Sequence, residues 1–113
     1  GAHVMILTGQ GYSFMWPEGA ERMRFAWGPG SLVVPPEGWF HQHFNSGDQP
    51  ARYLALKMLS RRHKLVPGKI KSDVSVKQGG MQIEYEDEDP EIRRLFEEEC
   101  ARSGAEVKMP KVV

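Results

Sequence analysis

Two histidines, His41 and His43, stand two residues apart in an aromatic segment that runs from Trp39 to Asn45. Residues two apart in a β-strand point to the same face, so both imidazoles are expected to share a face with Trp39 and Asn45. Two imidazoles on one face can chelate a divalent metal ion such as Fe, Mn, Ni or Zn, but a catalytic metal site needs a third protein ligand and an open position. No acidic residue accompanies them, and His3 is a more distant candidate for a third ligand. The alternative, which we favour, is that both histidines are hydrogen-bonded residues lining a cavity.

Aromatic side chains in the first half of the chain extend this candidate site. Such a set can line a pocket for an apolar ligand or fill the hydrophobic core, and core filling is the commoner outcome. A pocket shared with the histidines predicts a small-molecule ligand. The residues that we expect to line it are Tyr12, Phe14, Trp27, Trp39, His41, His43 and Asn45.

Short strands must position these side chains. The first half of the chain consists of segments rich in β-branched and aromatic residues, separated by Gly and Pro, which is typical of a β-sandwich or barrel. Apolar residues alternate along the segments, as in Leu54, Leu56 and Met58, so each strand has one face to bury. The predicted strands cover residues 3–8, 11–16, 21–27, 31–35, 39–45 and 51–58, and two weaker ones cover 74–76 and 81–85.

The end of the chain predicts an α-helix. Asp89 is suited to cap it, Pro90 to occupy its first position and Gly104 to end it. One apolar stripe runs along this helix, and we expect the stripe to lie across the sheet or against a partner chain. The stripe contains Ile92, Leu95, Phe96 and Cys100, while Arg93 with Glu97 and Arg94 with Glu98 form i,i+4 pairs. The basic stretch 61–71 and the acidic stretch 84–91 are most simply solvated surface.

Composition limits the functional classes. The 113 residues include 15 Lys and Arg against 15 Asp and Glu, so no net charge draws the molecule to nucleic acid or anionic lipid. No apolar run approaches the roughly 20 residues of a membrane span, and the N-terminus lacks the features of a secretion signal. A single cysteine cannot form an intrachain disulfide, which fits a reducing compartment. We therefore expect a cytoplasmic protein that binds neither nucleic acid nor membrane.

The stretch Gly30 to Asn45 (GSLVVPPEGWFHQHFN) resembles the second sequence motif of the cupin superfamily, G(X)5PXG(X)2H(X)3N, at every fixed position. Residues 5–12 (MILTGQGY) look like the strand and turn that close the first cupin motif. The resemblance implies a mainly β fold, a small or partial cupin (jelly-roll-like) antiparallel β-barrel with a C-terminal α-helix. The barrel is expected in residues 1–85, and an acidic segment, the helix and a tail are expected in residues 86–113, packed on the barrel or on a partner chain.

Cupins generally hold a divalent metal with two His and a Glu of the first motif and one His of the second. The resemblance therefore implies a metal-ligand role for His41 only. The upstream His-x-His and Glu are not in this sequence, and Ser31 stands where the second motif usually has Asp. Residues 1–4 look like a tag remnant, so we treat the chain as either a short cupin or a fragment of a longer one. The acidic stretch and helix resemble the tail of bacterial gentisate-dioxygenase-like cupins.

Three functional hypotheses follow. The leading one is a cupin-fold protein that binds a small molecule in the barrel interior. The second is a metal-dependent, dioxygenase-like enzyme in which His41 and His43 bind a metal with help from a neighbouring chain. The third is a structural oligomerisation module. A barrel without its first strands keeps open edges and an uncovered apolar face, so we also expect a homodimer.

Overall fold

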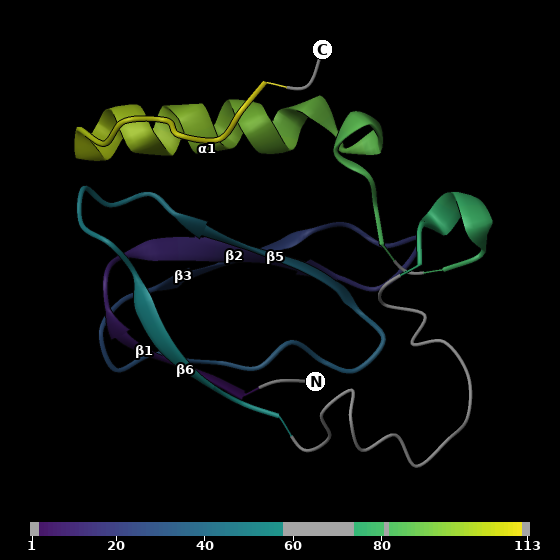
Figure 1. The fold of residues 1–113 in the computed structure, drawn as a ribbon, viewed down its shortest axis with the longest axis horizontal. Coiled ribbons are helices and arrows are strands. Elements are labelled where there is room, and N and C mark those ends of the chain that lie inside the picture. The colour runs from purple at the N-terminus through teal and green to yellow at the C-terminus, as the bar shows by residue number, and fades with distance from the viewer. Residues whose placement is uncertain (1–2, 58–73, 81, 112–113) are drawn as a thin grey trace.

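Two three-stranded antiparallel sheets and one long helix make up the computed structural model of the chain (Figure 1). The structure describes residues 3–57, 74–80 and 82–111. We call the sheet with strand order β4-β1-β6 sheet A and the sheet with order β3-β2-β5 sheet B. The strands are β1 (His3–Thr8), β2 (Gly11–Trp16), β3 (Met23–Trp27), β4 (Leu32–Val33), β5 (Phe40–Asn45) and β6 (Arg52–Leu56).

The predicted β-rich architecture with a C-terminal helix is therefore confirmed, and all six strands of the first half lie within their predicted segments. Strand β4 is only two residues long, because Pro35 and Pro36 follow it and lack the N–H that would continue a ladder. Within the described residues the two sheets stay separate, so a closed barrel is not formed there.

The two weaker strand predictions, 74–76 and 81–85, are wrong for the residues that the structure describes. Ser75 and Gln82 form one isolated bridge. A short 3-10 helix, η3 (Val76–Gln78), lies between them, and a second, η4 (Tyr85–Asp87), follows. Gly79 ends η3 in the left-handed conformation, which turns the chain before a strand can extend. Residue 58 of the sixth predicted strand, residue 81 and the basic stretch 61–71 lie outside the described residues.

The two sheets pack through one hydrophobic cluster. Its buried members come from both sheets and are Val4, Ile6, Met15, Trp27 and Val33, with Trp39 and Ala51 packed against them. Period-two alternation explains this set, since Val4 and Ile6 share one face of β1 while Met5 and Leu7 occupy the other. The cluster marks the space between the sheets as the inside of the β-fold.

The turns of the segment 28–39 lead the chain into β4 and then into β5. The Trp39 N–H donates to the Pro36 carbonyl at 3.2 Å, and Gly38, inside this turn, has φ +81°. Gly30 has φ +86° in a second turn, where the Ser31 N–H donates to the Gly28 carbonyl at 3.0 Å. Both glycines occupy a backbone region that side chains disfavour, so the sequence pattern and the turn geometry agree.

Helix α1 (Pro90–Ser103) lies across sheet B on the side away from sheet A (Figure 1). The Asp89 carboxylate accepts from the Glu91 N–H at 3.0 Å, and Gly104 ends the helix in the left-handed conformation, both as predicted. The apolar stripe packs on the outer face of sheet B and forms a second cluster of Tyr12, Phe14, Phe44, Ile92, Phe96 and Cys100. Both predicted i,i+4 ion pairs are present, at 2.7 Å and 3.0 Å.

Two further ion pairs tie this helix to strand β3 and the turn before it. Arg22 contacts Asp89 at 2.8 Å, and Arg24 contacts Glu99 at 2.9 Å. The helix is thus held on sheet B by an apolar centre and by charges at both of its ends. Among the described residues, no helix has the length and hydropathy that crossing a bilayer requires.

Candidate functional site

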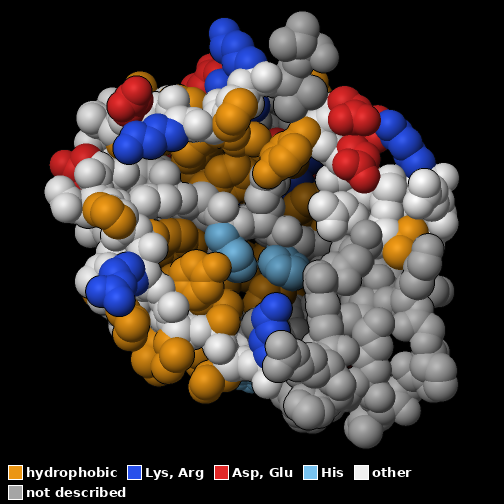
Figure 2. Space-filling view, in the orientation of Figure 1, with side chains coloured by type: hydrophobic (Ala, Val, Ile, Leu, Met, Phe, Trp, Pro, Cys, Tyr) orange, Lys and Arg blue, Asp and Glu red, His pale blue; other side chains and the backbone are white. Residues whose placement is uncertain are grey.

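Strand β5 presents both histidines to the space between the sheets. In the register of sheet B, His43 lies opposite Ser13 and His41 lies opposite Met15. Met15 belongs to the cluster between the sheets, so its face of sheet B points toward sheet A. The predicted shared face of His41 and His43 is therefore the inner face, and Figure 2 shows histidine side chains among hydrophobic ones at the centre of the view.

A short hydrogen-bonded chain holds His43. The Trp27 indole N–H donates to Ser13 Oγ at 3.0 Å, and Ser13 Oγ lies 2.6 Å from His43 Nδ1. Ser13 is fully buried and Trp27 is nearly so. We call this chain of three side chains, from strands β3, β2 and β5, the Trp27–Ser13–His43 relay.

The relay defines which ring nitrogen of His43 carries the proton. Ser13 Oγ already accepts a hydrogen bond from Trp27. The Ser13 hydroxyl hydrogen gains an acceptor of its own if the hydroxyl donates to Nδ1 of His43. The opposite arrangement, with an N–H at Nδ1, would leave the hydroxyl hydrogen of a fully buried serine without an acceptor among the described residues. The neutral ring therefore carries its hydrogen on Nε2, where it is a donor.

The environment of His43 favours this neutral form. Burial lowers the pKa of His43 from its ordinary value of 6.5, and the nearby His41 lowers it further. The two ring centroids are 5.4 Å apart with planes inclined by 48°. The Nδ1 edge of His43 is packed against Ser13 while another part of the side chain remains exposed. At neutral pH the side chain is an uncharged hydrogen-bond donor.

A cavity of about 280 Å³ opens beside this ring, between the two sheets. Strand β1 supplies apolar wall from sheet A, and β3 and β5 supply the opposite wall from sheet B. Among the described residues that line it, none is acidic or basic apart from His43. They are Val4, Ile6, Trp27, His43, Asn45, Ala51 and Tyr53.

The structure brings together only part of the predicted site. Trp27, His43 and Asn45 line the cavity, His41 lies beside His43, and Trp39 packs against the cluster between the sheets. The Asn45 side chain is engaged locally, since it accepts from the Gly47 N–H at 3.1 Å and donates to the Gln49 carbonyl at 2.9 Å.

Tyr12 and Phe14 lie on the opposite face of sheet B. They are packed beneath helix α1 with Phe44, and the Tyr12 ring stacks on Phe44 with 5.0 Å between centroids. Alternation along β2 explains why they lie on the opposite face from the histidines. Ser13 and Met15 point to the inner face, so Tyr12 and Phe14 point to the outer one. Sequence reasoning grouped these aromatics with the histidines without assigning their face.

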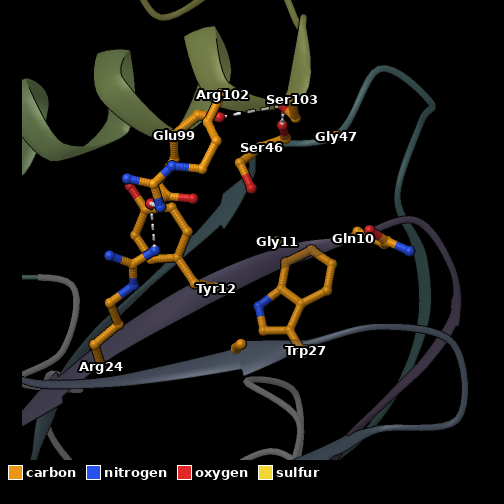
Figure 3. A pocket seen from close by; sticks show the side chains of 11 residues that line it. Gln10, Gly11, Tyr12, Arg24, Trp27, Ser46, Gly47, Glu99, Arg102 and Ser103 are labelled. Atoms are coloured by element: carbon orange, nitrogen blue, oxygen red, sulfur yellow. Dashed lines mark hydrogen bonds and ion pairs between the residues drawn. The ribbon is translucent and has the colours of Figure 1, made fainter.

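A second cavity, of about 290 Å³, lies between the end of helix α1 and sheet B (Figure 3). Its charged groups are engaged with one another, since Glu99 contacts Arg24 at 2.9 Å and Arg102 at 2.6 Å. The Arg24 guanidinium also lies 4.5 Å from the centroid of the Tyr12 ring. These contacts attach the helix to the sheet, and the cavity lies on the far side of sheet B from the histidines.

The described residues supply only part of a metal site. Two imidazoles are adjacent, but among the described residues no group of three or more His, Cys, Asp and Glu side chains could hold a metal ion. His3 cannot join them from its strand, because it pairs with Leu56 on the outer face of sheet A. A metal-bound histidine also usually donates its other ring N–H to a carboxylate, a carbonyl or water, whereas Nδ1 of His43 accepts from Ser13. The residues described do not fit a complete metal centre.

Sequence reasoning missed Ser13 and Tyr53. Ser13 is a small polar residue between two aromatics on β2, and its position opposite His43 depends on the pairing of β2 with β5. Tyr53 reaches the cavity because β6 pairs with β1, which is distant in sequence. A polar residue inside an otherwise apolar strand was the available signal for Ser13. Comparison with known proteins adds no relative, since no family model, curated protein or solved structure matches this chain.

Proposed function

We propose that this protein binds a small molecule in the cavity between its two sheets. The observation that carries the proposal is the fixed orientation of His43: a buried relay of Trp27 and Ser13 supplies its Nδ1 partner, while the same side chain lines the cavity. Preorganised polar groups in an otherwise apolar cavity are typical of ligand sites. A volume of about 280 Å³ lies near the lower end of such sites, so the ligand is small.

The cavity chemistry also limits the ligand class. His43 offers an N–H donor at Nε2, and the other described lining residues add apolar surface and no full charge. A carboxylate or phosphate ligand would find no cationic side chain among these residues. Burying an unpaired negative charge in an apolar site costs free energy, so such ligands are disfavoured. We therefore propose an uncharged, largely apolar molecule with one hydrogen-bond acceptor, such as a ketone, an ester or an amide, that accepts from Nε2.

The cupin resemblance supports the same location. The turns at Gly30 and Gly38 deliver His41 and His43 to the inner face of sheet B, as a cupin-like barrel interior requires. We propose that the two sheets are the halves of a jelly-roll-like fold, that the protein acts as a homodimer, and that it resides in the cytoplasm. The lone cysteine, Cys100, is buried on the face of helix α1 that packs on sheet B, which is compatible with a reducing compartment.

A metal-dependent, dioxygenase-like activity is the second candidate, favoured by the adjacent rings of His41 and His43. Metal analysis of the purified protein and of a His41→Ala variant tests it. Stoichiometric metal in the unmutated protein that is lost in the variant would support this candidate over the metal-free binding site. Metal absent from both would remove it. A structural oligomerisation role remains if neither metal nor ligand binds.

The binding proposal is tested by filling the cavity. A set of small uncharged ketones, esters and amides, with matched carboxylates, is screened by ¹H–¹⁵N NMR for chemical-shift changes. We expect uncharged compounds to shift resonances of residues that line the cavity and carboxylates to bind more weakly. An Ala51→Leu variant, which places a larger side chain in the cavity wall, should abolish these shifts.

The matched control is Ala101→Leu, because Ala101 is exposed on helix α1 and the substitution adds the same atoms away from the cavity. It should leave binding unchanged. A His43→Phe variant should weaken binding at least tenfold while an apolar wall is retained. Binding that survives Ala51→Leu, or no binding by any compound at millimolar concentration, would overturn the proposal.

A further inference from the structure

Three of the four sheet faces have a packing partner within the described part of the chain. The inner faces of sheets A and B pack on each other through the cluster that contains Val4 and Met15, while Met23 and Phe25 of β3, on the inner face of sheet B, remain 39% and 46% exposed. Helix α1 covers the outer face of sheet B through Phe96 and its neighbours. The outer face of sheet A has no such helix: Figure 1 shows α1 on the other side of the molecule from β1 and β6.

This outer face of sheet A is apolar. The register places Met5 of β1 between Leu32 of β4 and Leu54 of β6, so the three side chains form a row across the sheet. Leu7 continues the face along β1, and Leu56 continues it along β6. We call these five residues the outer patch of sheet A.

Each residue of the outer patch is between 46% and 62% exposed, whereas the residues that alternate with them on β1, Val4 and Ile6, are buried. Hydrophobic side chains also gather over this part of the molecule in Figure 2, toward the lower edge of the view where Figure 1 places β1 and β6. An amphipathic strand normally turns polar residues to solvent, so five large apolar residues on the outer side need an explanation.

The size of the patch suits a protein interface. The exposed area of its five residues is on the order of 500 Å², at the upper part of the range for the largest patch on a monomer. A standard interface buries roughly 800 Å² on each partner, of which about 57% is non-polar. The patch therefore matches the apolar share of one side of such an interface.

The chemistry of the patch favours a second copy of this chain as the partner. The strands place no acidic residue on this face. Its basic residues, Arg52 and His3, lie at opposite ends of the patch, beyond Leu54 and opposite Leu56, so the centre of the patch carries no charged side chain. A charged partner would find no complementary charge there, whereas an apolar patch is complementary to itself across a two-fold axis. Strand β6 is also an edge strand of the sheet, which allows a partner to approach.

We propose that the outer patch of sheet A is the interface of a homodimer related by a two-fold axis. The proposal rests on the homodimer proposed above and names the surface through which the chain pairs. It is independent of ligand binding because the cavity lies on the other face of the same sheet. The partner covers Met5, Leu32, Leu54 and their neighbours in the way that α1 covers sheet B.

Sedimentation velocity between about 1 and 100 μM tests the interface. We expect the unmutated protein to sediment as a dimer over most of this range and a Met5→Lys, Leu54→Lys double variant to sediment as a monomer. Both positions are already exposed, so the variant should keep the circular dichroism spectrum of the fold. Val76→Lys with Tyr85→Lys is the matched control, since both of these exposed apolar residues lie on the 3-10 helices away from sheet A, and it should remain a dimer.

The thermal midpoint supplies a second readout. It should rise with protein concentration for the unmutated chain and the control, and stay constant for the double variant. A monomer at 100 μM, or a dimer that persists in the double variant, would overturn the proposal. Binding of the monomer to phosphatidylcholine vesicles, lost in the double variant, would assign the patch to a lipid surface and overturn it as well.

Discussion

Ser13 and His43 face each other across strands β2 and β5, with 2.6 Å between the serine oxygen and Nδ1 of the imidazole. The serine is fully buried, and it accepts from the Trp27 indole at the same time. One small hydroxyl therefore joins the three strands of sheet B through side chains as well as through the backbone. It also fixes the orientation of a ring that lines the cavity.

Replacing Ser13 with alanine should lower the free energy of unfolding by about 1 to 3 kcal/mol, because the buried Trp27 N–H loses its acceptor. Urea unfolding followed by tryptophan fluorescence measures this change. Ser46→Ala is the control, because the Ser46 hydroxyl makes no hydrogen bond among the described residues, and it should change the free energy by less than about 0.5 kcal/mol. Equal effects for the two variants would argue against the relay.

The stability of the protein should fall as the pH drops through the range in which His43 titrates. Burial and His41 lower the pKa of His43 below 6.5, so the unfolded chain takes up a proton before the folded protein does. The free energy of unfolding is then unaffected by His43 well above pH 6.5 and decreases below it, until folded His43 is itself protonated. Urea unfolding between about pH 7.5 and 5.5 should show a smaller decrease in a His43→Gln variant.

NMR titration of the His43 ring provides an independent check. A His41→Gln variant should raise the pKa of His43 part of the way toward 6.5, because burial, the larger cause, stays in place. An unchanged His43 pKa in that variant would mean that the two rings do not interact.

Gly11 should not tolerate a side chain. A methyl group added there would lie 2.6 Å from the Trp27 ring and would also meet the Phe44 carbonyl. We expect Gly11→Ala to lower the free energy of unfolding by more than about 2 kcal/mol, through strain in sheet B. Gly28→Ala is the matched control, since its methyl would meet nothing nearer than 4.0 Å. Thermal unfolding of the two variants should separate them, and similar midpoints would contradict the packing described.

Replacing Tyr12 with phenylalanine should not destabilise the protein. Its hydroxyl is buried and has no hydrogen-bond partner among the described residues, so removing it deletes an unsatisfied polar group. Tyr12→Phe should leave the free energy of unfolding unchanged or raise it by up to about 1 kcal/mol. A clear loss in urea unfolding would show that the hydroxyl has a partner.

The same burial raises the pKa of Tyr12 to about 12. The unfolded chain ionises this phenol near its ordinary value of 10.0, so the folded state loses stability as the pH rises from about 10 toward 12. Absorbance of phenolate during an alkaline titration should show one tyrosine fewer titrating near pH 10 in the folded unmutated protein than in the unfolded chain. The Tyr12→Phe variant should lack this difference.

The start of helix α1 depends on Asp89. Its carboxylate caps the Glu91 N–H and also pairs with Arg22, so Asp89→Ala should cost about 1 kcal/mol in the free energy of unfolding. Asp89→Asn keeps an oxygen for the cap and removes the charge, and it should cost only a few tenths of a kcal/mol. If both variants cost the same, the ion pair rather than the cap would carry the effect.

Local patterns were sufficient to predict most of the individual elements. Helix α1 begins and ends at Asp89 and Gly104 because capping depends on residues adjacent in sequence. Strands β1, β2 and β5 match their predicted bounds to within a residue, because alternation and turn residues are also local. The weak strands near Ser75 and Gln82 failed because two short apolar runs were not long enough to outweigh the turn at Gly79 and Gly80.

The candidate site could be predicted only in part because it depends on pairing between distant segments. The pair His41 and His43 follows from spacing along one strand. Ser13 joins them only because β5 pairs with β2, and the cavity exists only because the two sheets stack. Tyr12 and Phe14 were placed with the histidines because alternation shows that residues share a face without showing which face is inside.

The position of β1 has a consequence for how the chain folds. Strands β2 and β3 are joined by a short connection and pair locally, whereas His3 at the start of β1 pairs with Leu56 near the end of the sheet region. Contacts that close so long a loop form late, because the entropy lost in closing the loop precedes the gain from the contacts. We expect sheet B to form first and β1 to dock last. During synthesis, the N-terminal strand β1 can then pair with β6 only after the ribosome has released β6.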